Sequence, residues 1–238
     1  MNIGLLQCDR VDEKYAPEHG QYPDMFATLL KQVDPTITFT IYDALHDDLP
    51  ANADACDAYL ITGSRHGVND DLPWIAKLEH FIRTLHARQK KIIGICFGHQ
   101  LIAKALGGRV SKSPSGWGVG MSHNTITQKK SWMVPTRDAF NVLISHQDQV
   151  VALPPEAEVL ASNETCPVFM MQIGRSFTVQ GHPEFSKGYS AALIKGREDI
   201  LGDLCYKRGM TSLQLPADDA LIAQWIINFL NHDTFILS

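Results

Sequence analysis

The sequence predicts an α/β fold: a single domain over residues 1–238, with a central, mostly parallel sheet flanked by helices and a smaller antiparallel strand insertion. Three observations lead to this prediction. With 238 residues and 45% hydrophobic side chains, the chain suits one large globular domain. Up to about residue 108, short apolar runs alternate with segments of helical periodicity, which is typical of parallel strands joined by helices. Beyond that point, strand-like runs follow one another closely, which favours antiparallel pairing.

Short apolar runs predict four strands in the first part, at residues 3–6, 37–42, 59–62 and 92–96. The segments between them carry apolar side chains three and four residues apart. These are Phe26, Leu29, Leu30 and Val33 in the first helix, and Ile75, Leu78, Ile82 and Leu85 in the second, which has Pro73 near its start. Strands that alternate with helices are covered on both faces, which predicts a flavodoxin-like three-layer arrangement.

The second part contains strand-like runs around Val110 and at 125–127, 142–145, 159–161, 168–173 and 177–180. We expect these runs to form the insertion and to return to the main sheet. Near the C-terminal end, one further segment has helical spacing, at Leu221, Ile222, Trp225, Ile226, Phe229 and Leu230. Its apolar stripe predicts a helix that packs on the core rather than one that binds a partner.

Composition excludes several classes of function. The chain has 21 basic and 26 acidic side chains and no block of Lys or Arg, so we expect no nucleic-acid partner. No apolar run approaches the roughly 20 residues of a membrane helix, so we expect no membrane partner and a cytoplasmic location. No histidine pair has the spacing of a zinc helix, and we expect neither metal nor cofactor. The cysteines are odd in number and widely spread, which favours reduced thiols: Cys8, Cys56, Cys96, Cys166 and Cys205.

A G-x-C-x-G motif at residues 94–98 joins a predicted strand to a predicted helix. Glycines two residues on either side allow a sharp turn that holds the central side chain in a strained, exposed position, the nucleophile elbow. Cys96 occupies this position, where a helix N-terminus favours the reactive thiolate. A buried cysteine in a glycine-rich turn is an equally good interpretation of this motif alone. His99, three residues further on, is expected to support the elbow.

His182 and Glu184 follow another strand-like run. Pro183 favours extended geometry at His182, so that the two side chains, two residues apart, point the same way. A histidine oriented by a carboxylate can activate a thiol and protonate a leaving amine. A surface turn would explain this segment taken alone, but its coincidence with a cysteine elbow favours a Cys-His-Glu triad.

With these residues in place, the sequence resembles the class I, or triad-type, glutamine amidotransferases, in particular stand-alone members similar to the amidotransferase domain of GMP synthetase. The resemblance covers nearly the whole chain. Five ordered blocks carry it, at residues 61–64, 94–100, 116–120, 145–150 and 180–185. The set includes a complete triad, which makes the resemblance specific.

The resemblance implies roles for individual residues. Cys96 is expected to be the nucleophile, His182 the general base and acid, and Glu184 the orienting carboxylate. The oxyanion hole is expected at the backbone N–H groups of Gly63 and Phe97. Gly63 ends a predicted strand, where backbone can approach a developing oxyanion.

Substrate binding is expected at two further places. Gln100 resembles the family's contact to the substrate glutamine. Ser145, His146 and Gln147 fall in a block that resembles the loop holding the glutamyl amino and carboxylate groups, chiefly through backbone. Some relatives have glycine at Gln147, and His146 is expected to have a structural or binding role rather than to be a second catalytic histidine. Trp117 lines the mouth of the site or packs a tight turn, and the sequence leaves both readings open.

Two loops could recognise the part of the substrate beyond its γ-glutamyl group. Arg65 and His66 follow the strand that ends at Gly63, where many relatives carry small residues. Tyr15, Glu18 and His19 lie in the loop after the first strand. Charged loop residues are usually only solvated, which is the alternative for both groups.

The implied chemistry is Cys96-dependent hydrolysis of a γ-glutamyl amide through a γ-glutamyl thioester, with a small γ-glutamyl molecule as substrate. Residues 187–238 predict only helices that complete the same domain, and no nucleotide-binding motif is present. We therefore favour a self-sufficient hydrolase of glutamine or of a γ-glutamyl peptide or amine. The alternative is a glutaminase subunit that supplies ammonia to a separate synthetase chain. A binding or regulatory protein without turnover is a third hypothesis, which loss of a triad residue would have supported.

Overall fold

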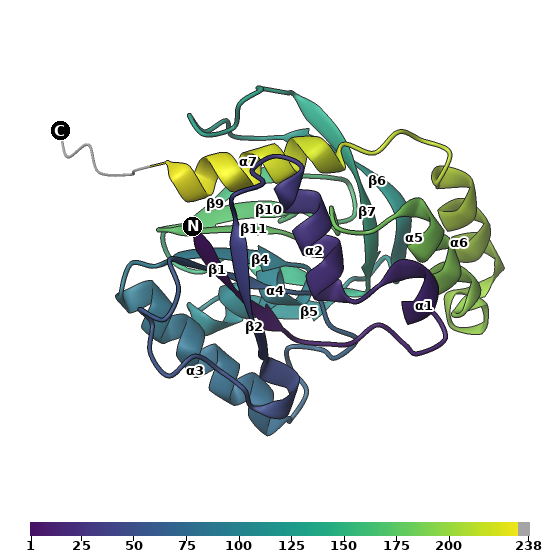
Figure 1. Cartoon of the computed structure of the whole chain (residues 1–238). Coiled ribbons are helices and arrows are strands. Elements are labelled where there is room, and N and C mark those ends of the chain that lie inside the picture. Colours follow the sequence, from purple (N-terminus) through teal and green to yellow (C-terminus); the bar gives the residue numbers. More distant parts are fainter. Residues whose placement is uncertain (233–238) are drawn as a thin grey trace.

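The computed structural model describes residues 1–232. Its strands are β1 (Asn2–Gln7), β2 (Thr38–Asp43), β3 (Ala58–Ile61), β4 (Lys91–Ile95), β5 (Arg109–Lys112), β6 (Gly118–Ile126), β7 (Ala139–His146), β8 (Asp148–Ala152), β9 (Glu158–Ser162), β10 (Met170–Ile173) and β11 (Ser176–Val179). Its helices are α1 (Ala16–His19), α2 (Tyr22–Lys31), the 3-10 turn η1 (Ala44–His46), α3 (Pro73–Ala87), α4 (Phe97–Ala105), α5 (Lys187–Lys195), α6 (Glu198–Ser212) and α7 (Asp219–Asn231). Figure 1 shows their arrangement.

A nine-stranded sheet runs through the molecule in the order β2-β1-β3-β4-β11-β10-β9-β6-β7. The strands from β2 to β11 are parallel, and those from β11 to β7 pair antiparallel. The predicted α/β fold is therefore confirmed. The antiparallel strands continue the main sheet beyond β11, and β5 and β8 form a separate two-stranded sheet.

Helices cover both faces of the parallel strands. Side chains along each strand alternate between these faces, so each strand contributes to two cores. Ile93 and Ile95 of β4 belong to a core shared with α2 and α7, whereas Ile92 belongs to the core shared with α3 and α4. Pro73 begins α3 as expected. Trp225 of α7 is fully buried, which confirms that this helix packs on the core.

The antiparallel strands have a cover of their own. Helices α5 and α6 pack against β6 and β7, where Met121 and Leu143 share a third core with Tyr189 and Ile194. The sequence indicated β6 only at its end, because its first residues are rich in glycine. At Gly120, with φ +85°, a Cβ would collide with the backbone of Gly209 in α6, so the glycine allows this close contact.

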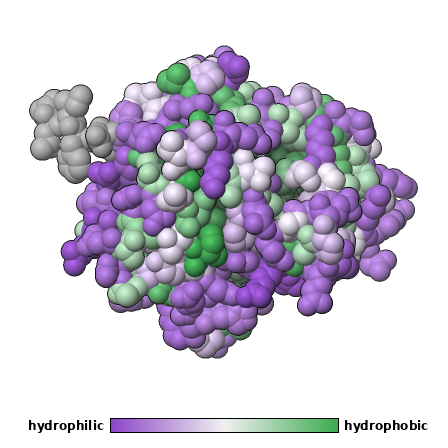
Figure 2. All heavy atoms as spheres, viewed as in Figure 1, coloured by the Kyte–Doolittle hydropathy of each residue, from purple (hydrophilic) through white to green (hydrophobic). Residues whose placement is uncertain are grey.

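The topology brings three chain segments to one edge of the sheet. β3, β4 and β11 are parallel neighbours, and their carboxyl ends lead directly into Thr62, Cys96 and Gln180. Ligand sites in open α/β sheets lie outside the carboxyl ends of the strands. None of the helices in the described residues is long and apolar enough to cross a membrane. Figure 2 shows a mostly hydrophilic face with its hydrophobic side chains in small groups.

Candidate active site

Cys96 lies in the sharp turn between β4 and α4. Its backbone has φ 50° and ψ −98°, a strained conformation for a residue with a side chain. A Cβ on Gly98 would lie 2.5 Å from the Ile61 carbonyl oxygen, and a Cβ on Gly94 would lie 2.8 Å from the Gly98 carbonyl carbon. Both glycines are therefore required by close backbone contact, and the motif folds as the predicted sharp, strained turn. The Cys96 side chain was predicted to be exposed, but it is buried, with an exposed fraction of 5% for the residue.

His182 and Glu184 lie immediately after β11, beside the elbow. The Nδ1 atom of His182 is 2.7 Å from Oε1 of Glu184, and the exposed fractions of the two side chains are 5% and 0%. The His182 N–H donates to the Leu143 carbonyl at 2.7 Å, which ties this segment to β7. The ring also stacks on Phe185, with centroids 4.0 Å apart. The orientation of the imidazole is thus fixed by three contacts.

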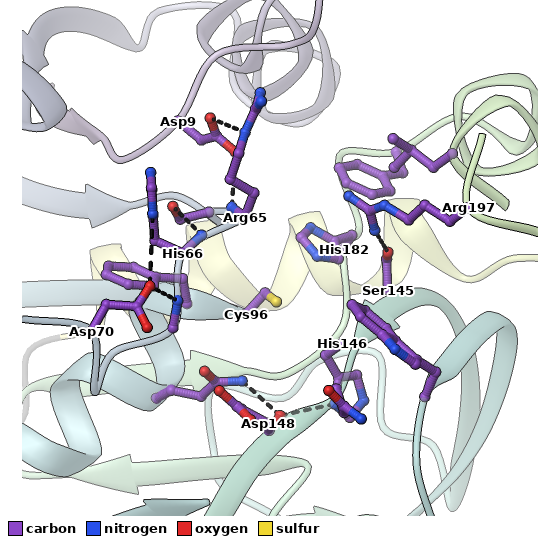
Figure 3. Close-up of a pocket in the computed structure, with 18 of the residues that line it drawn as sticks. Asp9, Arg65, His66, Asp70, Cys96, Ser145, His146, Asp148, His182 and Arg197 are labelled. Atoms are coloured by element: carbon purple, nitrogen blue, oxygen red, sulfur yellow. Dashed lines mark hydrogen bonds and ion pairs between the residues drawn. The ribbon is translucent and has the colours of Figure 1, made fainter. Parts of the chain in front are cut away.

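The charge state of His182 follows from its neighbours. Burial lowers its pKa, but the Cys96 sulfur and the Glu184 carboxylate raise it more, to about 10. His182 is therefore an imidazolium at neutral pH. Figure 3 shows the Cys96 sulfur pointing towards the part of the cavity where the His182 ring lies. The arrangement can hold a thiolate next to an imidazolium, which is the reactive form of a cysteine–histidine pair.

Gly63 follows β3 and lies beside His182 and Cys96. A Cβ at this position would lie 2.7 Å from Cε1 of His182 and 3.7 Å from Cβ of Cys96. The absence of a side chain at Gly63 therefore leaves room for the His182 ring beside Cys96. Within residues 1–232, the N–H groups of Gly63 and Phe97 donate to no protein acceptor.

A cavity of about 290 Å³ opens above Cys96 (Figure 3). Seven of the nine predicted site residues line it: Cys96, Phe97, Gln100, Ser145, His146, Gln147 and His182. Gly63 and Glu184 do not line the cavity, but both lie against His182, which does. Arg65, His66 and Trp117 also line the cavity, and Tyr15 lines a neighbouring one.

Residues 20–195 match the family model of the class-I glutamine amidotransferases. The chain belongs to this family. This confirms the resemblance that the five sequence blocks indicate. The match contains the elbow and the His182–Glu184 segment, whereas Asp9 and Arg197 of the cavity lie outside it.

Individual relatives agree with this assignment. The chain is 33% identical to γ-glutamyl peptidase 3 of Arabidopsis thaliana, over 77% of this chain and 76% of the relative. It is 30% identical to a glutamine amidotransferase-like protein of Schizosaccharomyces pombe, over 96% and 98% of the two chains. It is 32% identical to a GMP synthase of Aeropyrum pernix, over 69% of this chain but 31% of that enzyme. A crystal structure of a glutamine amidotransferase from Thermotoga maritima has the same fold, with a TM-score of 0.72 and 16% identity over 96% of each chain.

Gln100 is held inside this amidotransferase by two hydrogen bonds. Its Nε2 donates to the Asp148 carbonyl at 2.8 Å and to Oε1 of Gln180 at 3.1 Å. Nε2 of Gln180 lies 3.5 Å from the Cys96 sulfur. Gln180 is fully buried, and sequence reasoning did not assign it to the site, although it begins the matching block at 180–185. Only its position at the end of a strand beside the elbow could have indicated its contact to the thiol.

His146 and His99 are buried and neutral. Nδ1 of His146 donates to the Asp148 carbonyl at 3.0 Å, and burial lowers its pKa to about 4. His99 contacts the Thr178 hydroxyl at 2.7 Å and the Val168 carbonyl at 3.1 Å, and burial lowers its pKa to about 3. His99 thus ties α4 to the sheet behind the elbow, in agreement with its expected supporting role.

The rim of the cavity carries charged side chains. Nε of Arg65 is 2.9 Å from Oδ1 of Asp9, so this guanidinium is neutralised within the protein. His66 lies 3.7 Å from the Asp70 carboxylate. Nη1 of Arg197 donates to the Ser145 hydroxyl at 2.9 Å. Arg197 and Asp70 were not singled out from the sequence, since no motif marks them, and Asp148 falls in the block at 145–150 without having been assigned a role.

The remaining thiols lie outside this cavity. Cys8, Cys56 and Cys166 are buried, whereas Cys205 on α6 is only partly buried. Burial raises the pKa of the Cys166 thiol to about 12. In the described part of the chain, no three His, Cys, Asp or Glu side chains are arranged to hold a metal ion.

Proposed function

We propose that this protein hydrolyses γ-glutamyl amide bonds through a covalent γ-glutamyl thioester on Cys96. The single observation that carries the proposal is that a strained cysteine and a carboxylate-bound histidine line one cavity, with the glycine Gly63 packed beside them. The names of its relatives, which include γ-glutamyl peptidases, support this choice of substrate.

In the first step, the Cys96 thiolate attacks the γ-carbonyl carbon and forms a carbon–sulfur bond. His182 starts this step as an imidazolium and donates its proton to the leaving nitrogen as the carbon–nitrogen bond breaks. Glu184 stabilises the imidazolium and holds its Nδ1–H, so that Nε2 can act on the substrate. A free amine leaves.

The oxyanion that forms during the attack needs preorganised donors. The N–H groups of Gly63 and Phe97 are suitable, because no protein acceptor in residues 1–232 occupies them and both lie beside Cys96. Phe97 is also the first residue of α4, whose N-terminal dipole favours negative charge.

In the second step, water attacks the thioester while His182 accepts one of its protons. The carbon–sulfur bond breaks, glutamate is released and the thiolate–imidazolium pair is restored. The sum is one γ-glutamyl amide plus one water giving glutamate and one amine, with no change in oxidation state.

A glutaminase that feeds a synthetase is the second candidate. It is favoured by the similarity to GMP synthase, of which this chain matches 31%. The γ-glutamyl peptidase relatives favour the self-sufficient hydrolase, since about three quarters of both chains align. A non-catalytic binding protein would not need the strained Cys96 or the buried His182–Glu184 pair.

The test measures release of glutamate and amine from L-glutamine, γ-glutamyl peptides and γ-glutamyl amines. Cys96→Ala is expected to reduce turnover at least about 10⁴-fold without loss of folding, because the nucleophile is lost. Cys56→Ala, which removes another buried thiol outside the cavity, is the matched control. Mass spectrometry of quenched wild-type protein should find one glutamyl group on the peptide that contains Cys96. Full turnover by Cys96→Ala would eliminate the thiol mechanism, and turnover only in the presence of a synthetase would select the second candidate.

A further inference from the structure

The charges around the cavity are separated. Asp148 and Asp70 converge on Gly67, where a Cβ would lie 3.2 Å from an oxygen of each carboxylate. Lys112 of β5 is the direct register partner of Asp148 in β8. The end of the cavity lined by Asp70, Lys112 and Asp148 therefore offers both carboxylates and an ammonium group. It suits the α-amino and α-carboxylate groups of a γ-glutamyl substrate.

Arg197 lies at the other end. Figure 3 shows Arg197 and Ser145 on the His182 side of the Cys96 sulfur, whereas Asp70 and Asp148 lie across from it. The Arg197 guanidinium is held by the Ser145 hydroxyl and lies over the Trp117 ring, 5.8 Å from its centroid. Among the described residues, no carboxylate lies within ion-pair distance of it, in contrast to Arg65 with Asp9. Arg197 is thus a preordered cation at the cavity wall, without an anionic partner in residues 1–232.

The direction of the leaving group follows from the chemistry. A general acid must reach the nitrogen that it protonates, so the amine half of the substrate lies on the His182 side of the scissile bond. That is the side of Arg197. A second cavity, of about 210 Å³, shares Asp9, Tyr22, Arg65, Leu193 and Arg197 with the first, so space continues past the guanidinium.

We propose that Arg197 binds the carboxylate of the amine half, and that the preferred substrates are γ-glutamyl amino acids. The inference rests on the proposed hydrolase function and narrows its substrate class. A guanidinium presents several parallel N–H donors to a carboxylate, and with one Nη1–H used by Ser145 others remain available. Glutamine and γ-glutamyl amines lack this carboxylate and make no such contact.

The experiment compares kcat/KM for γ-glutamylglycine, γ-glutamylglycinamide and L-glutamine. Wild-type protein is expected to prefer γ-glutamylglycine to its neutral amide by about tenfold or more, because hydrogen bonds between charged groups are the strong ones. Arg197→Gln should lose about 10- to 100-fold on γ-glutamylglycine and less than about threefold on the other two. Arg197→Lys should keep part of the preference, since it retains the charge but not the fork.

Arg208→Gln is the matched control, because it removes the same charge from an exposed position of α6 outside both cavities. Thermal unfolding of each variant checks the fold. An equal loss on all three substrates would place Arg197 at the glutamyl half or in the fold, and an unchanged kcat/KM for γ-glutamylglycine would remove it from binding. Either result overturns the proposal.

Equilibrium binding separates this proposal from the proposed function. In a Cys96→Ala background, calorimetry should find that Arg197→Gln weakens binding of γ-glutamylglycine but not of γ-glutamylglycinamide. If wild-type protein hydrolyses neither compound and this difference persists, the hydrolase function fails and the carboxylate site stands. If turnover is fast and binding does not depend on the carboxylate, the site fails and the function stands.

Discussion

Cys96 and Arg197 face the same cavity but are positioned in different ways. Around Cys96, packing is so close that neither Gly98, against the Ile61 backbone of β3, nor Gly63, against the His182 ring, has space for a side chain. Around Arg197, the arrangement depends on single side-chain contacts, to Ser145 of β7 and to the ring of Trp117 before β6. The nucleophile elbow is thus fixed by close backbone packing, whereas the residue proposed to select substrates is held by side-chain contacts.

The largest effect is expected from filling the space at the elbow. Gly98→Ala would place its Cβ 2.5 Å from the Ile61 carbonyl oxygen, and backbone cannot move aside cheaply. We expect a loss of about 3 kcal/mol in the free energy of unfolding, together with loss of turnover on every substrate. Denaturant unfolding and the glutamate-release assay measure the two effects.

Gly188→Ala in α5 is the control for this comparison. A Cβ there meets only ordinary contacts, at 3.5 Å or more, and the residue is helical. This variant should be neutral or more stable by about 0.5–1 kcal/mol, since alanine favours helix. Similar costs for the two variants would contradict the view that backbone packing fixes the elbow.

The same difference explains what the sequence could predict. The elbow was predictable because the requirement for glycine at 94 and 98 acts locally and is visible as a motif. The pairing of His182 with Glu184 was predictable from their spacing on an extended segment. Arg197 was not, because it binds a residue 52 positions away and lies where only a continuing helical pattern is visible. Side-chain contacts between distant elements leave no local pattern in one sequence.

Stability should also depend on pH, through two buried neutral histidines, one in helix α4 and one in strand β7. Burial lowers the folded-state pKa of His99, beside β11, to about 3 and that of His146, at the end of β7, to about 4. The unfolded chain takes up these protons near pH 6.5, so each histidine destabilises the fold as the pH falls from 6.5 towards 4. From pH 7 to pH 5 the loss is about 2 kcal/mol for each.

His146→Gln should remove one of these losses. We expect the fall in unfolding free energy between pH 7 and pH 5 to be smaller in this variant by about 2 kcal/mol. His182 has the opposite sign, because its raised pKa of about 10 stabilises the fold below pH 6.5 and this contribution is lost as the pH rises towards 10. Urea unfolding at several pH values measures all three, and an identical acid dependence of wild type and His146→Gln would show that His146 is not buried as a neutral group.

The smallest effect is expected at Gln180, which contacts the nucleophile through its side chain. Gln180 touches the Cys96 sulfur with Nε2 and accepts a hydrogen bond from Gln100, which in turn donates to the Asp148 carbonyl. These two amide side chains connect the Cys96 nucleophile to the end of the cavity where Asp148 lies. Gln180→Leu keeps the volume but removes both contacts, so kcat should fall about tenfold, the effect of one hydrogen bond to a charged group.

The pattern across substrates distinguishes this effect from that of Arg197. Because Gln180 contacts the thiol rather than the amine half, the loss should be equal for L-glutamine and γ-glutamylglycine. Gln172→Leu, which removes an amide from β10 outside the cavity, is the control and should leave kcat unchanged. A loss confined to γ-glutamylglycine would place Gln180 with the residues that select the substrate. It would then contradict the distinction between a nucleophile fixed by backbone packing and a selecting residue held by side-chain contacts.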